Sequence, residues 1–386
     1  MINLVGDTIS NKEIDDLRNW LGTYPKLTKG SKTIEFEEAW SKTIGTKYSV
    51  FVNSGSSANL LMIYALIQQK RLVEGDIVLV PAVSWATTVA PIIQFGLHPV
   101  LVDADRDSLG IDVEHLEKLC KFHTPRALVL VHALGFPCKM KEIQDICNKY
   151  NVILMEDACE ALGSMYHGKN LGTFGLMSSF SLYYGHHLST IEGGMICTDD
   201  ERLYEMLKML RSHGWDRDVS EESKKFWRTT HNVDDFHALY TFYVPGFNVR
   251  ATDLQAFIGL SQLKKLQQVG RSRFIVFDRY HKTVKNNYWK VNDRYADVFI
   301  SCFAYPIIHP NVENIVEDLQ DNDIEVRPLI AGSMSKQPFF TKIYGNRTEV
   351  PFAEKIHKYG IYVPCHPFMT NEDVDKIVNI VNKYTI

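Results

Sequence analysis

The chain has 386 residues, of which 45% are hydrophobic and 23% charged, a composition typical of globular proteins rather than disordered or fibrous ones. With 42 basic and 46 acidic side chains the formal net charge is −4, which argues against a generally basic nucleic-acid-binding protein. No apolar run is long enough to span a membrane, and the first residues lack the basic and then apolar pattern of a secretory signal.

From residue 47 onward, short apolar segments alternate with amphipathic helical patterns. This alternation is typical of a parallel sheet covered by helices on both faces, in which ligands bind at the carboxyl ends of the strands. The expected strands are 47–53, 76–81, 98–105, 126–133 and 151–158.

After about residue 245 the pattern changes. A long helical pattern begins at 251 and continues toward 285, strands are expected at 298–307 and 323–329, and the chain closes with a helix from residue 371. We therefore expect a large α/β domain over 1–245 and a smaller α+β domain over 246–386.

The segment NSGSSANLL (53–61) lies where the first expected strand ends and a helix begins. Gly55 permits a tight turn, and Ser56 and Ser57 then place hydroxyl and backbone N–H groups at the helix start. Such a helix start can bind an anion such as phosphate. A plain serine cap of the helix is the alternative interpretation.

The segment MEDACEALG (155–163) puts Glu156 and Asp157 at the carboxyl end of an apolar strand. Buried acids need partners, and either a cationic ring nitrogen or a structural hydrogen bond would supply one. Trp85, just after another strand end, either stacks on a flat cofactor or belongs to the core.

The segment SSFSLYYGHHLSTIEGGMICTDD (178–200) carries His186 and His187 before a tight EGG turn and a short strand. The pair favours a functional role without identifying a reaction, and no third ligand has the spacing of a metal site. Asn248 and Arg250 precede a helix start, where polar groups usually serve as caps.

Together these segments resemble the DegT-type sugar aminotransferases, which use pyridoxal 5′-phosphate (PLP) and have the aspartate aminotransferase fold, fold type I. The resemblance covers nearly the whole chain, in order, through FEEAW, NSGSSANLL, PAVSWATT, EDACEALGS, FSLYYGHHLSTIEGGM, GFNVRATDLQAFIGL and VPCHPFMTNEDV. It implies a large domain with a mostly parallel sheet and a smaller α+β carboxyl-terminal domain.

The resemblance also implies which residues hold the cofactor. Asp157 would pair with the pyridinium nitrogen, and Trp85 would stack on the ring. Ser56, Ser57 and Ser181 would hold the phosphate.

Two further positions follow from the same resemblance. Asn248 would reach the phosphate of the neighbouring subunit's cofactor, which implies a homodimer with shared active sites. Glu160 lies near the cofactor's phenolic oxygen, where many relatives carry Gln.

One departure from the aminotransferases decides the expected reaction. They carry a Lys five residues after the phosphate-binding serine, Ser181, and that position is His186 here. No lysine occurs between Lys169 and Lys208, so the amine that would bind PLP covalently is absent. An imidazole cannot form that imine, but it can transfer protons near neutral pH.

A histidine at this position is the mark of the PLP-dependent nucleotide-sugar 3-dehydratases. This subgroup implies that L-glutamate converts noncovalently bound PLP into pyridoxamine 5′-phosphate (PMP), whose amine condenses with the C4 ketone of a GDP-linked 4-keto-6-deoxy sugar. His186 would remove a proton from C4′ of the cofactor, water would leave from C3, and ammonia would be released. The sugar would be a mannose-type hexose or a related heptose, destined for a surface polysaccharide.

Further residues are expected near the substrate. His187, Tyr183 and Tyr184 lie beside His186 in the sequence, and either tyrosine is an alternative acid for departure of the C3 hydroxyl. Arginine suits a diphosphate, although surface ion pairing is an equal alternative. The residues expected near the nucleotide sugar are Trp215, Arg217, Arg250 and Arg327.

Other functions stay open. An iron–sulfur dehydratase that needs a reductase would require clustered cysteines, whereas the seven cysteines are scattered and form no CxxC pair. Scattered thiols favour a cytoplasmic protein without disulfides. A plain aminotransferase would have to work without its lysine, and a noncatalytic sensor of PLP or a nucleotide sugar is the third alternative.

Overall fold

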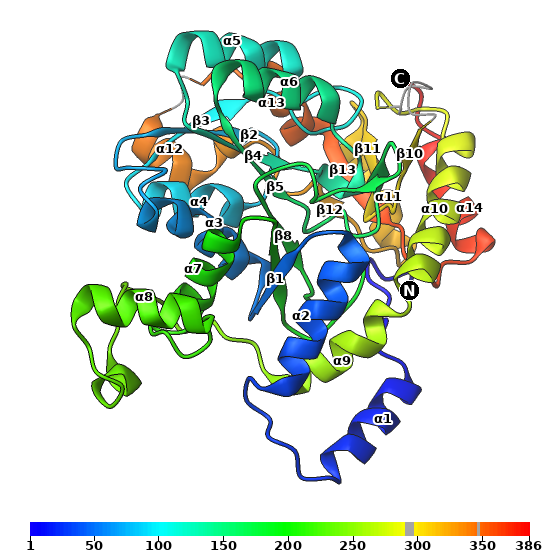
Figure 1. Cartoon of the computed structure of the whole chain (residues 1–386). Helices are drawn as coiled ribbons and strands as arrows, with labels where there is room; N and C mark the ends of the chain where they lie inside the picture. Colours follow the sequence, from blue (N-terminus) through cyan, green and yellow to red (C-terminus); the bar gives the residue numbers. More distant parts are fainter. Residues whose placement is uncertain (290–296, 346–347) are drawn as a thin grey trace.

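The computed structural model describes residues 1–289, 297–345 and 348–386, and a seven-stranded sheet forms its centre (Figure 1). The strand order is β1-β9-β8-β5-β4-β2-β3. The neighbouring pairs from β3 to β8 are parallel, and β9 runs antiparallel to both β8 and β1. The strands are β1 (Tyr48–Val52), β2 (Ile77–Pro81), β3 (His98–Val102), β4 (Ala127–Val131), β5 (Ile153–Asp157), β8 (Met177–Ser181) and β9 (Gly194–Thr198).

Successive strand residues enter two different cores, because neighbouring side chains of a strand point to opposite faces. Val78 and Val80 pack in one cluster with α3 and α7, whereas Leu79 packs in the other with α2, α5 and α6. The five strands predicted between residues 47 and 158 are confirmed. The covering helices are α2 (Ser31–Ile44), α3 (Gly55–Gln68), α4 (Ala86–Gln94), α5 (Val113–His123), α6 (Met140–Tyr150) and α7 (Glu201–Arg211).

The carboxyl-terminal part forms a smaller sheet of order β11-β13-β12, covered by helices. Ile2 forms an isolated parallel β-bridge with Ile324, so the amino terminus lies against this part of the molecule. The division at residue 245 remains a prediction. The elements are α10 (Leu266–Thr283), β11 (Ala304–Ile308), α11 (Val312–Asp321), β12 (Arg327–Pro328), η4 (Met334–Lys336), α12 (Pro338–Tyr344), α13 (Pro351–Tyr359), β13 (Gly360–Pro364) and α14 (Asn371–Val381).

Three predicted elements were wrong in extent, including the strand expected at 323–329, of which β12 forms only residues 327–328. The long helix after residue 251 is two helices, α9 (Asp253–Leu263) and α10, separated by a turn at residues 264–265, where the Lys265 side chain donates to the Thr8 carbonyl. The strand expected at 298–307 is interrupted, since residues 301–303 bond to loop and helix groups instead of a neighbouring strand. Before the break, β10 (Val298–Phe299) joins a small sheet with β6 (Met165–Tyr166) and β7 (Lys169–Asn170).

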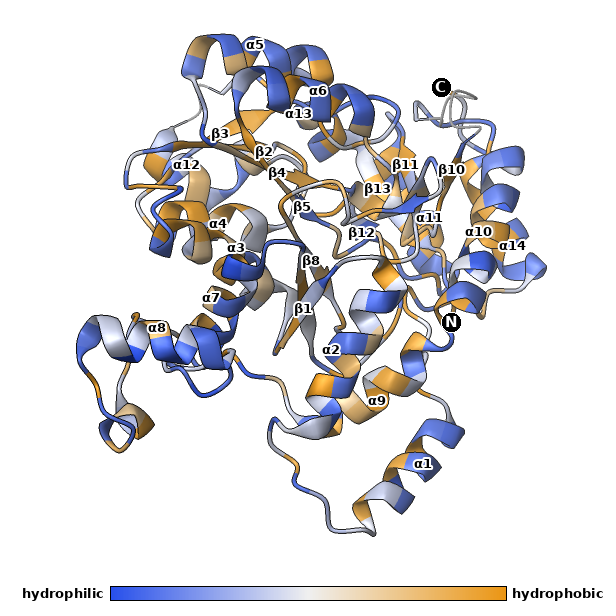
Figure 2. Cartoon of the chain, in the orientation of Figure 1, coloured by the Kyte–Doolittle hydropathy of each residue, from blue (hydrophilic) through white to orange (hydrophobic). Residues whose placement is uncertain are grey.

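Two helical segments extend away from the main sheet in Figure 1, namely α1 (Asn11–Leu21) and α8 (Glu221–His231). No residue of α8 is buried. Hydrophobic residues recur in the short helix η2 (His237–Tyr240) and the loop around it, as Figure 2 shows. Among the described residues, no helix is long and apolar enough to cross a membrane.

Asp253 ties α9 to the start of α2, whose N-cap, Gly30, has no side chain to cap the helix. Its buried carboxylate accepts hydrogen bonds from the amides of Gly30 at 2.7 Å and Thr33 at 2.9 Å, and from the Thr33 hydroxyl at 2.7 Å. These amides would otherwise lack intrahelical acceptors. A residue 220 positions away in sequence thus caps this helix.

Replacing Asp253 with Ala should lower the free energy of unfolding by about 2–3 kcal/mol, since several buried donors lose their acceptor. Urea denaturation followed by circular dichroism measures the effect. Asp253→Asn keeps one acceptor oxygen and should lose less. Equal losses for the two variants would contradict the capping role.

Candidate active site

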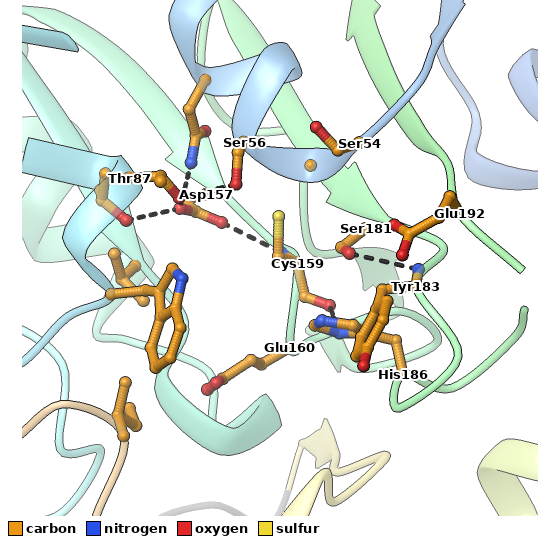
Figure 3. Close-up of a pocket in the computed structure, with 16 residues that line it drawn as sticks. Ser54, Ser56, Thr87, Asp157, Cys159, Glu160, Ser181, Tyr183, His186 and Glu192 are labelled. Carbon is orange, nitrogen blue, oxygen red and sulfur yellow. Dashed lines mark hydrogen bonds between the residues drawn. The ribbon is translucent and has the colours of Figure 1, made fainter. Parts of the chain in front are cut away.

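A cavity of about 370 Å³ opens at the carboxyl ends of the parallel strands, beside the starts of α3 and α4 (Figure 3). Seven of the predicted site residues line it: Ser56, Trp85, Asp157, Glu160, Ser181, Tyr183 and His186. Further polar side chains that were not predicted from the sequence also line it: Ser54, Asn59, Thr87, Thr88, Cys159 and Glu192.

Asp157, the last residue of β5, is buried and firmly held. Its Oδ2 accepts hydrogen bonds from Asn59 Nδ2 at 2.7 Å and Thr88 Oγ1 at 2.8 Å. Its Oδ1 accepts the amide of Cys159, at 3.2 Å. An ionised carboxylate can accept about four hydrogen bonds, so Oδ1 keeps capacity for a cationic group in the cavity.

The start of α3 forms a cradle of small polar groups. Ser54 is the helix cap, and its hydroxyl accepts from the Ser57 amide at 3.0 Å. A Cβ atom on Gly55 would lie 2.8 Å from Ser181 Cβ, so only glycine lets the helix start approach β8 this closely. The hydroxyls of Ser56 and Ser181 are thus left to line the cavity.

His186 reaches the cavity as a neutral imidazole. Its Nδ1 lies 2.8 Å from the carbonyl oxygen of Cys159, which can only accept, so Nδ1 carries the proton. Nε2 is then left with a lone pair. The pKa of His186 is lowered to about 4, chiefly by burial and also by the positive charge of Arg273, while the Cys159 carbonyl and Asp157 oppose the decrease.

Glu160 lies between these groups, with its side chain directed at the open space in Figure 3. Its Oε2 accepts the amide of Leu134 at 2.8 Å. Burial raises the pKa of Glu160 to about 7, the charge of Asp157 adds to the increase, and the Leu134 amide opposes it. The carboxyl group can therefore donate or accept a proton near neutral pH.

Three residues expected beside these groups do not line the cavity. His187 is fully buried, and its Nε2 bonds to the Ser301 carbonyl at 2.8 Å, so the expected substrate contact is not supported by its position. The side chain of Tyr184 is exposed outside the cavity. The Ser57 hydroxyl accepts from Ser54 Oγ at 3.1 Å.

The remaining expected residues also lie outside the cavity of a single chain. Arg217 stacks on Trp215, with its guanidinium carbon 3.7 Å from the ring centroid, and Arg250 lies 6.0 Å from the same ring. Arg327 pairs with a glutamate two residues before it, at 2.9 Å. Asn248 is exposed and bridges the backbone near α7.

A model of the DegT/DnrJ/EryC1/StrS aminotransferase family matches residues 7–382. The chain belongs to this family. Two DegT-family relatives carry the name GDP-4-keto-6-deoxy-D-mannose 3-dehydratase. The protein from Escherichia coli O55:H7 is 37% identical over 92% of this chain and 93% of its own. The protein from Yersinia pseudotuberculosis is 35% identical over 99% of each chain.

Solved structures of the DegT family confirm the predicted fold. A GDP-4-keto-6-deoxymannose-3-dehydratase with bound GDP-perosamine has a TM-score of 0.89 and 32% identity, covering 99% of this chain and 100% of that one. The same enzyme with a trapped PLP–glutamate geminal diamine has a TM-score of 0.88, with the same identity and coverage.

In this DegT-family protein, Glu160 should make stability depend on pH. Because its pKa is raised from 4.5 to about 7 in the folded state, the folded protein is penalised as pH rises through that window. Glu160→Gln removes the penalty. In urea titrations of the cofactor-free protein, the free energy of unfolding of the variant should nearly match that of the wild type at pH 4.5 and exceed it by about 3 kcal/mol at pH 8. A difference that does not change with pH would contradict the assignment.

Proposed function

We propose that the protein is a PLP- and L-glutamate-dependent dehydratase that removes the C3 hydroxyl of a GDP-linked 4-keto-6-deoxy sugar. The observation that carries the proposal is His186, which stands where the aminotransferases have lysine and reaches the cavity with a free Nε2. No lysine lines the described cavity. The names of the two relatives at 37% and 35% identity support the same reaction.

The polar groups of the cavity fit PLP. Oδ1 of Asp157, which can accept a further hydrogen bond, suits a protonated pyridine nitrogen. The α3 start, with Ser56 and Ser181, suits a phosphate, and the ring of Trp85 offers a stacking surface. Bound PLP would supply an electron sink and, after exchange with glutamate, the amine that reacts with the C4 ketone.

His186 would perform the proton transfers. Its Nε2 accepts the proton at C4′ of the cofactor, while the Cys159 carbonyl holds the ring in place. The imidazolium that results can return this proton to the departing C3 hydroxyl, which leaves as water. Tyr183, which also lines the cavity, is the alternative acid. Overall, glutamate becomes 2-oxoglutarate, its nitrogen leaves as ammonia, and a 4-keto-3-deoxy sugar remains.

A homodimer with shared active sites is part of the proposal. Asn248 is exposed and does not line the cavity of its own chain, as expected of a residue that serves a neighbouring subunit. Exposed apolar side chains that stand close in sequence support a partner surface. One set lies on α1, on α2 and on the chain between them, and consists of Ile14, Leu21, Tyr24, Leu27 and Ile34. The other set lies around η2 and consists of Phe236, Leu239, Tyr240 and Phe242.

The nucleotide would be bound by arginines outside the cavity. Arg217 and Arg327 present exposed guanidinium groups that suit diphosphate oxygens, and Arg250 is a further candidate. Trp215, already stacked on Arg217, offers an aromatic face. Tyr184 would contact the sugar from the cavity edge.

The alternatives predict different products. An aminotransferase would release a 4-amino sugar. An iron–sulfur enzyme would need a ligand cluster, and the described residues hold no group of three or more His, Cys, Asp or Glu side chains placed to bind a metal. A sensor would bind PLP or the nucleotide sugar without turnover.

The test is incubation of the purified protein with PLP, L-glutamate and GDP-4-keto-6-deoxy-mannose. The sugar product is identified by mass spectrometry and NMR, and ammonia and 2-oxoglutarate are assayed in the same reaction. We expect a 3-deoxy-4-keto product with ammonia. A 4-amino sugar would overturn the proposal, and the matching heptose is the second substrate if the hexose is inert.

His186→Lys should change cofactor binding from noncovalent to covalent. Borohydride reduction should add the mass of one PLP to the variant but not to the wild type, because only lysine forms an imine with the aldehyde. Dehydration should fall by about 10²-fold or more. His186→Asn, which lacks both amine and imidazole, should show neither adduct nor turnover. A reducible adduct on wild-type protein would contradict noncovalent binding.

A further inference from the structure

Arg273, on α10, is a buried cation without a carboxylate partner in the part of the chain that the structure describes. Its Nη1 donates to the carbonyls of Cys302 at 3.1 Å, Phe303 at 2.9 Å and Cys365 at 2.6 Å. Its Nε has no hydrogen-bond partner among the described residues. Carbonyls solvate a cation but do not neutralise it, so Arg273 keeps a costly unpaired charge.

A second buried arginine in the same molecule shows the usual arrangement. Arg211 is 1% exposed and forms ion pairs with Glu37 and with Asp218. The acidic groups that act on Arg273 are instead the thiols of Cys302 and Cys365, and burial holds the pKa of Cys302 well above its ordinary value. That thiol stays neutral, and it leaves the guanidinium charge uncompensated.

The 301–303 segment connects Arg273 to both histidines. The Phe303 ring lies 5.1 Å from the His186 ring and 5.9 Å from the His187 ring. The Phe303 amide donates to Leu134 at 2.9 Å, and the Ser301 carbonyl is bound to His187. Arg273 therefore fixes the backbone of the residue against which His186 packs.

We propose that Arg273 is a positioning residue for proton transfer at His186: its hydrogen bonds hold the 301–303 segment in place, and its unpaired charge adds to burial in disfavouring the protonated imidazole. The inference rests on the proposed function of His186. It explains why a cation is retained in the core, since an apolar side chain would fill the space without the cost of burying a charge.

The groups that face His186 have opposite effects on the protonation of its imidazole ring. Asp157 and the Cys159 carbonyl favour the protonated ring, whereas burial and Arg273 oppose it. His187 packs behind it and stays neutral, since burial lowers the pKa of His187 well below its ordinary value. Tyr183, Glu160 and Glu192 complete the ionisable lining of the cavity.

The test is a pH titration of His186 by NMR on the full-length, cofactor-loaded protein with ¹⁵N-labelled histidine, using His186→Asn to assign the signal. Arg273→Gln keeps amide donors and removes the charge, whereas Arg273→Lys keeps the charge. We expect the His186 midpoint to rise by about half a unit or more in Arg273→Gln and to stay near the wild-type value in Arg273→Lys. Arg279→Gln, on the same helix but at an arginine that pairs with Asp375, is the matched control and should leave the midpoint unchanged.

An unchanged midpoint in folded Arg273→Gln would overturn the inference, as would equal shifts in the Gln and Lys variants. If Arg273→Gln does not fold, Arg273→Lys is the deciding variant. A role of the charge predicts an unchanged His186 midpoint in this variant. A purely structural role predicts a shifted midpoint, because lysine cannot make the same set of hydrogen bonds. The titration needs no turnover, so it remains decisive if the proposed substrate is inert. In a protein that turns over, the acidic limb of kcat/KM should move upward with the NMR midpoint in Arg273→Gln, while KM stays nearly constant.

Discussion

The hydrogen bond between His186 Nδ1 and the Cys159 carbonyl is the interaction on which the proposed chemistry depends. It fixes the tautomer, the ring orientation and the direction of the free Nε2. Burial then keeps the ring from being protonated at neutral pH. A lysine at the same position would hold a cofactor by a covalent bond, whereas an imidazole can only move protons, so binding and catalysis must be performed by separate groups.

The fold brings those groups together through the turn after β5. Within four residues, this turn supplies the Asp157 carboxylate, the Cys159 carbonyl and the Glu160 carboxyl group. The neighbouring strand β8 ends at Ser181, and the start of α3 packs against it through Gly55. Parallel strands end at one edge of a sheet, so groups from several segments meet around one cavity.

Much of the fold and of the site could be predicted from local sequence. Periodicity located the strands β1 to β5 but not β8, and a strand that ends in Asp157 indicated a buried acid at the sheet edge. The motif spacing placed His186 where relatives have lysine. A serine before a glycine at a helix start is also a cap signal, which would have identified Ser54 rather than Ser56 as the cap.

Contacts between distant segments could not be predicted in the same way. His187 turns into the core because its partner is the carbonyl of Ser301, more than a hundred residues later. Arg273 carries no motif, and its importance depends on which carbonyls surround it. The predicted strand over 298–307 was wrong because those same tertiary bonds interrupt it.

The most direct test of proton transfer by His186 is isotope exchange at C4′ of the cofactor. Wild-type protein and His186→Asn are each given PMP deuterated at C4′ together with GDP-4-keto-6-deoxy-mannose, and the recovered cofactor is analysed by mass spectrometry. If Nε2 of His186 is the base, wild type loses a single deuterium and His186→Asn retains both. Equal loss in the two proteins would show that another group removes the proton, and would contradict the role assigned to His186.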